Sequence, residues 1–365
     1  MFNRRQFTGA VPAVLGPSTL LAACSAGQSE YDAAAASAWR IGRLQGLEAA
    51  ALRTELARYA TLAPSSHNTQ CWKFKLEDRA ITVLPDFTRR CPAVDPDDHH
   101  LFVSLGCASE NLVIAAQALG LRADPRFDAA TDAVRIALEP APAVTSPLFK
   151  AIAERQCTRG DYDGKPLGAD ELTTLARAGT SDRVQVLLLT ERPRLEQVTE
   201  YVVQGNTAQM NDKAFVDELK AWIRFSGHDA VRLGDGLFAA SSGNPVVPAW
   251  VGEALFGLFF TPKAENEKYV KHLRSSAGVA VFAGQAADKA HWVEVGRAYE
   301  RFALQATVMG VRCAFVNQPV EVATLRPQFA SLIGLGSQRP DLVVRFGRGP
   351  KLPPSLRRPL QSVVV

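Results

Sequence analysis

The sequence predicts an α+β (α/β) protein built from two similar halves. Helical apolar spacing and short alternating strand patterns follow one another along its 365 residues, and one helical pattern occurs twice. That length suits about two domains of ordinary size. A hydrophobic content of 47% with 21% charged residues excludes a disordered or membrane-spanning chain. The 41 basic and 37 acidic residues include no dense basic run, so nucleic-acid binding is not expected.

Residues 1–27 are predicted to be an export signal. The twin arginines Arg4 and Arg5 precede an apolar segment, residues 10–21, that is too short to span a bilayer comfortably. Twin arginines (the Tat signal) are typical of the route that exports folded proteins. The sequence Leu-Ala-Ala-Cys ending at Cys24 resembles a bacterial lipoprotein box. These features predict a protein exported to the periplasm or cell envelope of a bacterium, with Cys24 as the candidate lipid site.

Five cysteines remain when Cys24 is set aside, an odd number without the spacing of a small disulfide scaffold. We therefore expect the core to stabilise the fold, with at most incidental disulfides. These cysteines are Cys71, Cys91, Cys107, Cys157 and Cys313.

The first half is predicted over residues 44–145, after a tether over residues 28–43 that is rich in small side chains. Helical spacing from Leu44 to Leu62 leads into a turn. Two alternating segments then predict a hairpin of strands, Trp72–Leu76 and Ile81–Leu84. The half is completed by a helix at Leu101–Leu119, a strand at Val134–Leu138 and a Pro-rich linker at Glu139–Pro147.

The second half is predicted over residues 146–365 and repeats this order. Its expected elements are helices near Ala169–Ala178 and Leu195–Val203 and a strand at Val184–Leu189. Within it, residues 223–269 form an insertion with glycine-rich joints and an aromatic segment. Such joints suit a lid that closes over a site, but the same apolar spacing also suits a helix packed on its own core.

One helical pattern appears in both halves. Gly106, Ala108, Glu110, Ala116 and Gly120 recur 190 positions later as Gly296, Ala298, Glu300, Ala306 and Gly310. Two amphipathic helices can share spacing by chance. Five identities without a gap favour an internal duplication instead.

Residues 63–72 read Ala-Pro-Ser-Ser-His-Asn-Thr-Gln-Cys-Trp. These small polar residues predict a turn able to hydrogen-bond a planar heterocycle, although such residues also make ordinary turns. The segment resembles the Pro-Ser-Ser-x-Asn-x-Gln-Pro-Trp signature of FMN-dependent nitroreductases, and only Cys71 departs from it, standing where the family has proline. The resemblance implies FMN as cofactor, and it assigns cofactor contacts to Pro64, Ser65, Ser66, Asn68 and Gln70.

Two basic segments suit the phosphate of FMN, which needs cations and N–H donors. Arg155-Gln-Cys-Thr-Arg159 resembles the Arg-x-Ser/Thr-x-Lys/Arg segment that opens the nitroreductase fold, with Cys157 in place of the hydroxyl. Guanidinium geometry fits phosphate oxygens. Near the C-terminus, Arg357 and Arg358 match the basic pair that the family uses on the same phosphate. Solvated arginines without this role are the alternative.

The two tandem halves resemble the Acg group of the nitroreductase-like superfamily. Nitroreductases are homodimers with flavins at the subunit interface, so fused halves imply a nitroreductase-like fold that forms this interface within one chain. Because the turn lies in one half and the phosphate groups lie in the other, we expect one complete FMN site per chain. The resemblance further implies a monomer that acts as a pseudo-dimer.

Asn317 and Gln318 align with the loop that lies beside flavin N5 in this family. Many nitroreductases have a glutamate there, and flavin chemistry responds to nearby charge, so this departure puts ordinary nitroreduction in doubt.

Residues 95–100, Asp-Pro-Asp-Asp-His-His, contain residue types that bind metals but also suit the start of a helix. Since no second ligand cluster is apparent, we predict no metal, and the sequence assigns no catalytic residue.

Two functions follow. The first is an FMN-dependent oxidoreductase that reduces a small electron-poor substrate, with a small-molecule acceptor and an unknown electron donor as partners. The second is an FMN-binding or sequestering protein of the cell envelope with little turnover.

Overall fold

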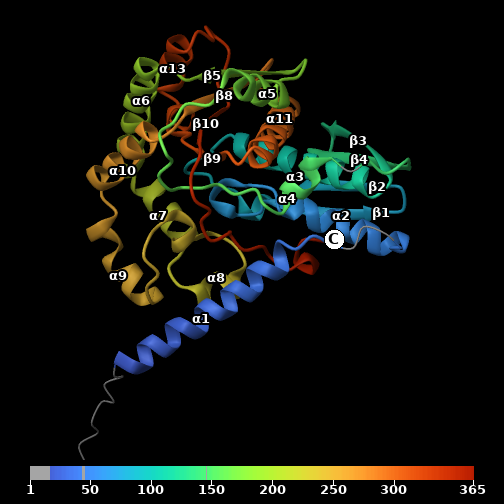
Figure 1. Cartoon of the computed structure of the whole chain (residues 1–365), viewed down its shortest axis with the longest axis horizontal. Coiled ribbons are helices and arrows are strands. Elements are labelled where there is room, and N and C mark those ends of the chain that lie inside the picture. Colours follow the sequence, from blue (N-terminus) through green and yellow to red (C-terminus); the bar gives the residue numbers. More distant parts are fainter. Residues whose placement is uncertain (1–16, 43–45, 145) are drawn as a thin grey trace, which may run out of the picture.

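The computed structural model describes residues 17–42, 46–144 and 146–365. Figure 1 shows two groups of strands with helices between and around them. The twin arginines and the start of the predicted apolar segment lie outside the described residues. Within the described chain, helices and antiparallel sheets are mixed, which confirms the predicted α+β class.

The first half contains an antiparallel sheet in the order β1-β2-β4-β3. The predicted hairpin is confirmed, since Trp72 pairs with Pro85 and Glu77 pairs with Ala80. The sequence prediction missed β3, whose Pro125 and alternating charges disfavour a central strand but suit an exposed edge. The strands are β1 (Trp72–Glu77), β2 (Ala80–Pro85), β3 (Leu121–Asp128) and β4 (Ala133–Pro140).

The second half contains a sheet in the order β5-β8-β10-β9. In both sheets the first strand of the half is followed by the second, the fourth and the third, and all neighbours are antiparallel. The halves thus share one topology. The strands are β5 (Val184–Leu189), β8 (Gly278–Gly284), β9 (Arg312–Phe315) and β10 (Leu342–Gly347).

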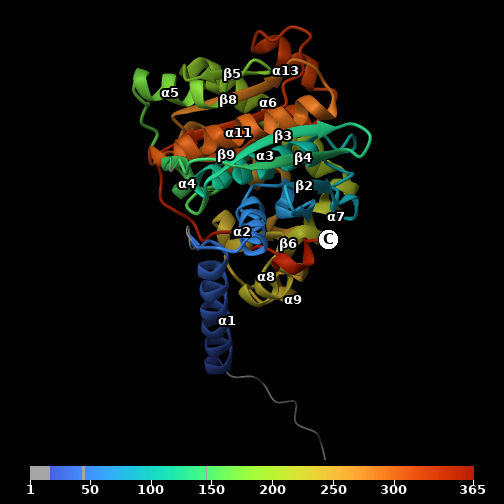
Figure 2. The same cartoon turned by 90° about the vertical axis from the view of Figure 1, so that its right-hand side faces the viewer.

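Helices α3 (His99–Ala118) and α11 (Lys289–Val308) lie side by side in the middle of the molecule (Figures 1 and 2). A Cβ added to Gly106 would lie 2.0 Å from the carbonyl oxygen of Val293, and one added to Gly296 would lie 1.9 Å from that of Val103. The two contacts are reciprocal, since each residue has its counterpart 190 positions away. The repeated glycines therefore allow two equivalent backbones to touch, whereas duplication as the origin stays a prediction.

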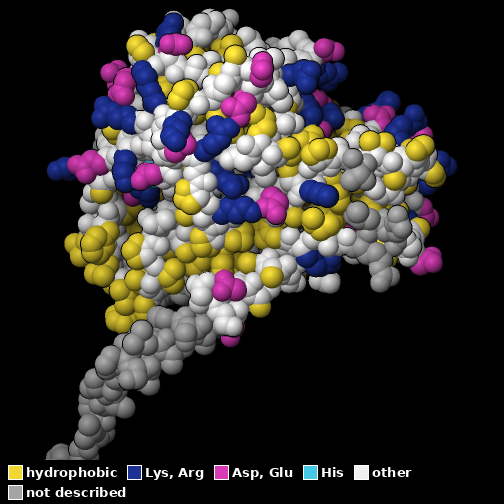
Figure 3. Space-filling view, in the orientation of Figure 1, with side chains coloured by type: hydrophobic (Ala, Val, Ile, Leu, Met, Phe, Trp, Pro, Cys, Tyr) yellow, Lys and Arg dark blue, Asp and Glu magenta, His cyan; other side chains and the backbone are white. Residues whose placement is uncertain are grey.

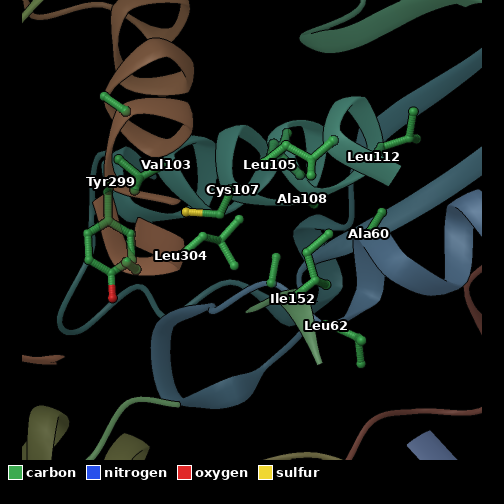
Figure 4. Packing of buried hydrophobic residues seen from close by; sticks show 14 of the residues in the cluster. Ala60, Leu62, Val103, Leu105, Cys107, Ala108, Leu112, Ile152, Tyr299 and Leu304 are labelled. Carbon is green, nitrogen blue, oxygen red and sulfur yellow. The ribbon is translucent and has the colours of Figure 1, made fainter. Parts of the chain in front are cut away.

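The core forms around this helix pair. Figure 4 shows Val103, Cys107 and Leu304 among its buried side chains, close to Tyr299. α2 (Ala49–Thr61) and α4 (Pro147–Ile152) pack against the pair. Among the described helices, α3 has the length and apolar composition of a membrane span, but 94% of that stretch is buried inside the protein.

The remaining helices cover the second sheet and form the insertion. α5 and α6 confirm the helices predicted near residues 169–178 and 195–203. A small two-stranded sheet, β6 (Ile223–Arg224) with β7 (Leu237–Phe238), lies within the insertion. The helices are α5 (Ala169–Gly179), α6 (Arg192–Asn211), α7 (Lys213–Trp222), α8 (Gly227–Leu233), α9 (Ala249–Phe259), α10 (Pro262–Arg274), α12 (Gln318–Glu321) and α13 (Arg326–Leu332).

The predicted tether is largely helical. Helix α1 (Pro17–Ala38) covers most of it, and the buried ring of Tyr31 packs 4.5 Å from that of Phe238. The Tyr31 hydroxyl also donates a hydrogen bond to the carbonyl of Pro354. Small residues suggest a flexible segment, but alanine has the highest helix propensity, and here the helix gains a packing partner. The helix predicted from Leu44 begins only at Ala49.

The C-terminal tail returns to the first half. Phe74 N donates to Val363 O at 2.7 Å, and Val365 N donates to Phe74 O at 3.0 Å. The tail thus runs beside β1 at the edge of the first sheet. This pairing brings Arg357 and Arg358 to the turn that follows α2. All five cysteines named above are free thiols.

Candidate functional site

The turn at residues 64–70 has an unusual backbone. His67, Asn68 and Gln70 have φ values of +48°, +55° and +54°. Residues other than glycine rarely adopt this left-handed region, although Asn and His do so more often than most. Neighbouring contacts must therefore hold the turn in this shape.

Side chains of the turn bond to the insertion. Asn68 Nδ2 donates to Gly236 O at 3.0 Å, and Gln70 Nε2 donates to Gly234 O at 2.8 Å. Ser65 Oγ accepts the backbone N–H of Gln70 at 2.9 Å. The conformation of the turn thus depends on residues more than 160 positions away.

The two C-terminal arginines also hold the turn. The guanidinium of Arg357 donates to the carbonyls of Thr61 at 2.6 Å and Leu62 at 2.9 Å, and to Asn68 Oδ1 at 3.1 Å. Arg358 N donates to Gln70 Oε1 at 2.8 Å. Gln70 and Arg358 were predicted to contact the cofactor, but they lie behind the turn and line neither cavity described next. Their contacts make them positioning residues.

Two adjoining cavities lie in front of the turn, and ten of the twelve predicted cofactor residues line them. The cavities share five wall residues: Pro64, Ser65, Arg159, Leu237 and Phe315. The smaller one also receives four predicted residues, namely Asn68, Arg155, Cys157 and Arg357. The larger one receives the other three, namely Ser66, Asn317 and Gln318. Segments from both halves and the C-terminus therefore meet at one place, with the basic groups gathered at one end.

Three arginines line the smaller cavity, and one carboxylate lies behind them. Arg155 is buried, with its Nε 3.3 Å from Glu300 Oε1, and it donates to Leu62 O at 3.1 Å. Burial raises the pKa of Glu300 to about 7. Burial, reinforced by the nearby charge of Arg155, lowers the pKa of Arg357 to about 9. Both directions reflect the cost of burying charge, and together they mark a site with excess positive charge that would attract an anion.

Several buried polar atoms on these walls have no hydrogen-bond partner among the described residues. In the smaller cavity they belong to Arg155, through Nη1, and to Ser241, through Oγ. In the larger cavity they include Gln318 Oε1 and His100 Nε2. Such atoms are costly to bury unless a ligand or water satisfies them. Donors at the basic end and mixed polar atoms at the other end fit a molecule with an anionic group and a polar ring.

Apart from Arg159, the polar walls of the larger cavity are acidic or neutral. Asn317 Oδ1 accepts Val343 N at 2.8 Å, so this oxygen is already committed to β10. Glu321 lies 3.8 Å from His100 Nδ1 and accepts Gln209 Nε2 at 2.7 Å. Burial raises the pKa of Glu321 and lowers that of His100, so neutral forms of both are favoured.

The insertion, for which the sequence left a lid and a packed core helix as alternatives, supplies part of the cavity wall. Leu237, Phe260 and Tyr269 line the larger cavity together with Phe215 and Leu219 of α7. Apolar residues at helical spacing carry no mark that separates a cavity wall from a core position. Part of the insertion therefore covers the site, whereas α9 leaves several aromatic and aliphatic side chains exposed.

Two groups of side chains within the described residues have ligand atoms close enough to hold a metal. Asp95, His99 and His100 form one, but both oxygens of Asp95 accept backbone N–H groups of the first turn of α3, at 3.0 Å each. This contact matches the helix-start alternative. The second group joins His67 and Cys91 to Glu218, a combination that the sequence did not suggest because the three residues lie far apart in the chain. Glu218 also accepts Ala93 N at 2.9 Å.

No family model matches the chain. Curated relatives match along nearly its whole length: "Putative NAD(P)H nitroreductase Rv3131" from Mycobacterium tuberculosis (strain ATCC 25618 / H37Rv) is 27% identical over 335 residues, covering 87% of this chain and 92% of the relative. "Putative NAD(P)H nitroreductase acg" from the same strain is 25% identical over 322 residues, covering 83% and 92%. The chain is nitroreductase-like. The predicted resemblance to nitroreductase-like proteins is thereby confirmed.

Solved structures similar to this nitroreductase-like chain include a nitroreductase with bound FMN from Bacteroides fragilis, at TM-score 0.36 and 16% identity, covering 56% of this chain and 90% of that one. Another is the FMN-dependent nitroreductase NfnB from Mycobacterium smegmatis in complex with NADPH, at TM-score 0.37 and 10% identity, covering 56% and 87%.

His67 gives the nitroreductase-like chain a testable pH dependence. Burial, followed by the charge of Arg159, lowers the pKa of His67 from 6.5 to about 4. Between these values the unfolded chain binds a proton that the folded chain does not, so His67 costs stability as the pH falls from 6.5 to about 4. We expect His67→Gln to make the fall in unfolding free energy over this range shallower in urea titrations. An unchanged slope would show that His67 titrates alike in both states.

Proposed function

We propose that the chain is an FMN-dependent oxidoreductase of the nitroreductase-like class that reduces a small electron-poor substrate. The observation that carries the proposal is the meeting of ten predicted cofactor residues, from distant segments, on two adjoining cavities. The names of the curated relatives support the same reaction class. We further propose export to the bacterial periplasm or cell envelope, which the sequence of residues 1–27 supports.

The residues present fit FMN in one orientation. Arg159, Arg155 Nη1 and Ser241 Oγ would hold the phosphate in the smaller cavity, while Ser66, Asn317 and Gln318 would contact the ring in the larger one. Bound FMN would supply two-electron transfer between a donor and a substrate. The hydrogen bonds of Arg357 and Gln70 hold the turn in its strained conformation before any ligand binds. Less conformational free energy is then lost when a ligand binds.

The walls of the larger cavity limit what could react there. Leu237, Phe260 and Tyr269 line the same cavity as Gln318 and give it bulky, largely apolar walls. A substrate small enough to enter would meet neutral amides at Asn317 and Gln318. Among the described residues, Arg159 is the one Lys or Arg side chain that lines this cavity, so a strongly anionic substrate is not favoured.

An anaerobic absorbance experiment tests the function. The purified protein is examined for a flavin spectrum, before and after adding FMN, and is then mixed with NADH, NADPH and finally dithionite. We expect an FMN spectrum that a nicotinamide bleaches and that a nitroarene or quinone restores. A protein that never binds FMN would refute the proposal.

A second function, FMN sequestration, is favoured by the covering of the larger cavity by the insertion. In that case dithionite alone would bleach the flavin, and FMN would dissociate slowly.

The variant Leu237→Ala tests whether the cavity walls retain FMN, because it removes a side chain that lines both cavities. We expect it to speed FMN release by roughly tenfold, given about 1.4 kcal/mol for part of a buried side chain. Stopped-flow transfer of FMN to an apoflavodoxin trap measures this rate, and equal rates would show that Leu237 does not retain the cofactor.

A further inference from the structure

Helix α9 exposes a large apolar surface. The side chains of Trp250, Leu258 and Phe259 are 73%, 70% and 72% exposed, and Leu255 of the helix and Val246, three residues before it, are also exposed. We call these five residues the α9 patch. Figure 3 shows hydrophobic side chains gathered at the lower-left edge, where Figure 1 places α9 in the same orientation. Monomeric soluble proteins rarely expose contiguous apolar surface of this kind without a function.

The orientation of α9 is fixed from its other face. A Cβ at Gly252 would lie 2.3 Å from the ring of Phe225, so only glycine allows the close approach. Phe256 stacks on Phe260 at 4.6 Å and meets Phe225 edge-on at 6.3 Å. Because these aromatic groups hold the inner face of α9, the α9 patch cannot turn inward without breaking this packing. The patch is therefore neither a wall of the cofactor cavities nor part of the core.

Helix α1 is held by the same part of the insertion. Tyr31 and Ala35 of α1 pack with Ala230 of α8, and α8 begins two residues after Phe225, the anchor of α9. The two perpendicular views show α1 and α9 at the same end of the molecule (Figures 1 and 2). From Tyr31 the helix continues toward Pro17 for about 21 Å, at about 1.5 Å per residue. The chain thus reaches outward from the end that carries the patch.

Most of the sequence before Glu30 has no charged side chain. Residues 6–29 contain no Asp, Glu, Lys or Arg, and they include the apolar segment and Cys24. One exposed charge on α9 itself, Glu253, interrupts the apolar character, and Lys220 donates to its backbone carbonyl at 3.3 Å. An exposed Trp-Leu-Phe surface supplies the apolar face that interfacial membrane binding requires.

We propose that the α9 patch rests on a lipid bilayer, on the side of the molecule from which the N-terminal segment emerges. Trp250 would lie at the headgroup level, where amphipathic rings are favoured, with Leu258 and Phe259 dipping toward the acyl chains. A single membrane contact gives marginal, reversible binding, so the patch provides a second one beside the N-terminal segment. This contact would also fix how the protein is oriented on the membrane.

Fluorescence from Trp250 tests the contact locally. The full-length protein is mixed with phosphatidylethanolamine–phosphatidylglycerol vesicles, with and without lipids brominated on their acyl chains. The chain has five tryptophans, and Trp250 is the strongly exposed one among the described residues. We expect brominated lipid to quench the wild type and not Trp250→Phe, which keeps the patch apolar. Vesicle-bound protein whose Trp250 stays unquenched would overturn the proposal, because the N-terminal segment would then bind alone.

Vesicle flotation measures the contribution of the patch. Replacing Leu255, Leu258 and Phe259 with serine should lower the partition coefficient of the full-length protein by roughly tenfold or more, since three apolar side chains are lost from the contact. Val144→Ser, at an exposed apolar residue of the linker, is the control and should leave binding unchanged. If the triple variant floats like the wild type, the proposal fails. It also fails if the patch instead joins two copies, seen as a dimer mass without lipid that the triple variant loses.

Discussion

Replacing Arg159 with glutamine is expected to weaken FMN binding by roughly 10- to 100-fold, while riboflavin binds as in the wild type. Arg159 lines both cavities and makes no hydrogen bond or ion pair within the described residues, so its charge is free for a ligand. A hydrogen bond to a charged group contributes about 1.5–3 kcal/mol, which gives this range of dissociation constants. Riboflavin lacks the phosphate and therefore isolates the effect.

Fluorescence titration of the apoprotein with each flavin measures both constants. Arg135→Gln is the matched control, because Arg135 is an exposed arginine on β4, away from the cavities. If FMN and riboflavin lose affinity equally in Arg159→Gln, the phosphate does not lie at Arg159. Arg155 is a poorer choice, since its loss would leave Glu300 buried without a partner and would destabilise the fold.

Gly106→Ala is expected to lower the free energy of unfolding by about 3 kcal/mol or more. Its methyl group would lie 2.0 Å from the Val293 carbonyl oxygen, and a backbone atom in the middle of α11 cannot move aside as a flexible side chain can. The two helices would have to separate at the point where the halves meet. Urea unfolding followed by circular dichroism measures the loss.

Gly257→Ala is the control for the change itself. Gly257 lies in α9, and a Cβ there would meet no atom within 4 Å. Alanine has the higher helix propensity, so this variant should be as stable as the wild type or more stable, by up to about 1 kcal/mol. If Gly106→Ala unfolds like Gly257→Ala, the reciprocal glycine contact does not hold the two halves together.

The sequence prediction located most helices and strands because their apolar periodicity is local. β5 was predicted with its observed ends. The predicted start of α3 lies two residues from the observed one, and its predicted end lies one residue away. The edge strand β3 was not predicted, because its apolar residues alternate with charged residues and a proline. α1 was not predicted as a helix because small side chains are common in helices and linkers alike. The packing of Tyr31 distinguishes the two.

The residues of the candidate site were predicted from the sequence, but which of them line the cavities and which hold the turn was not. Pro64, Ser65 and Ser66 were found from one motif, and they line the cavities. Gln70 belongs to the same motif and Arg358 to the C-terminal basic pair, yet they bond to each other behind the turn. Motif spacing cannot tell a residue that touches a ligand from one that holds the turn in place, because both follow the same pattern.

The sequence by itself determined the elements, the repeated helix and the residue types gathered at the site. Only the tertiary structure decided which groups meet. The bond between Arg358 and Gln70 joins positions 288 apart, and the carboxyl group behind Arg155, a loop residue, comes from Glu300 of α11. Periodicity reports the face of an element that is buried, whereas hydrogen bonds and ion pairs depend on how distant elements pack, and that packing sets the charge and shape of the site.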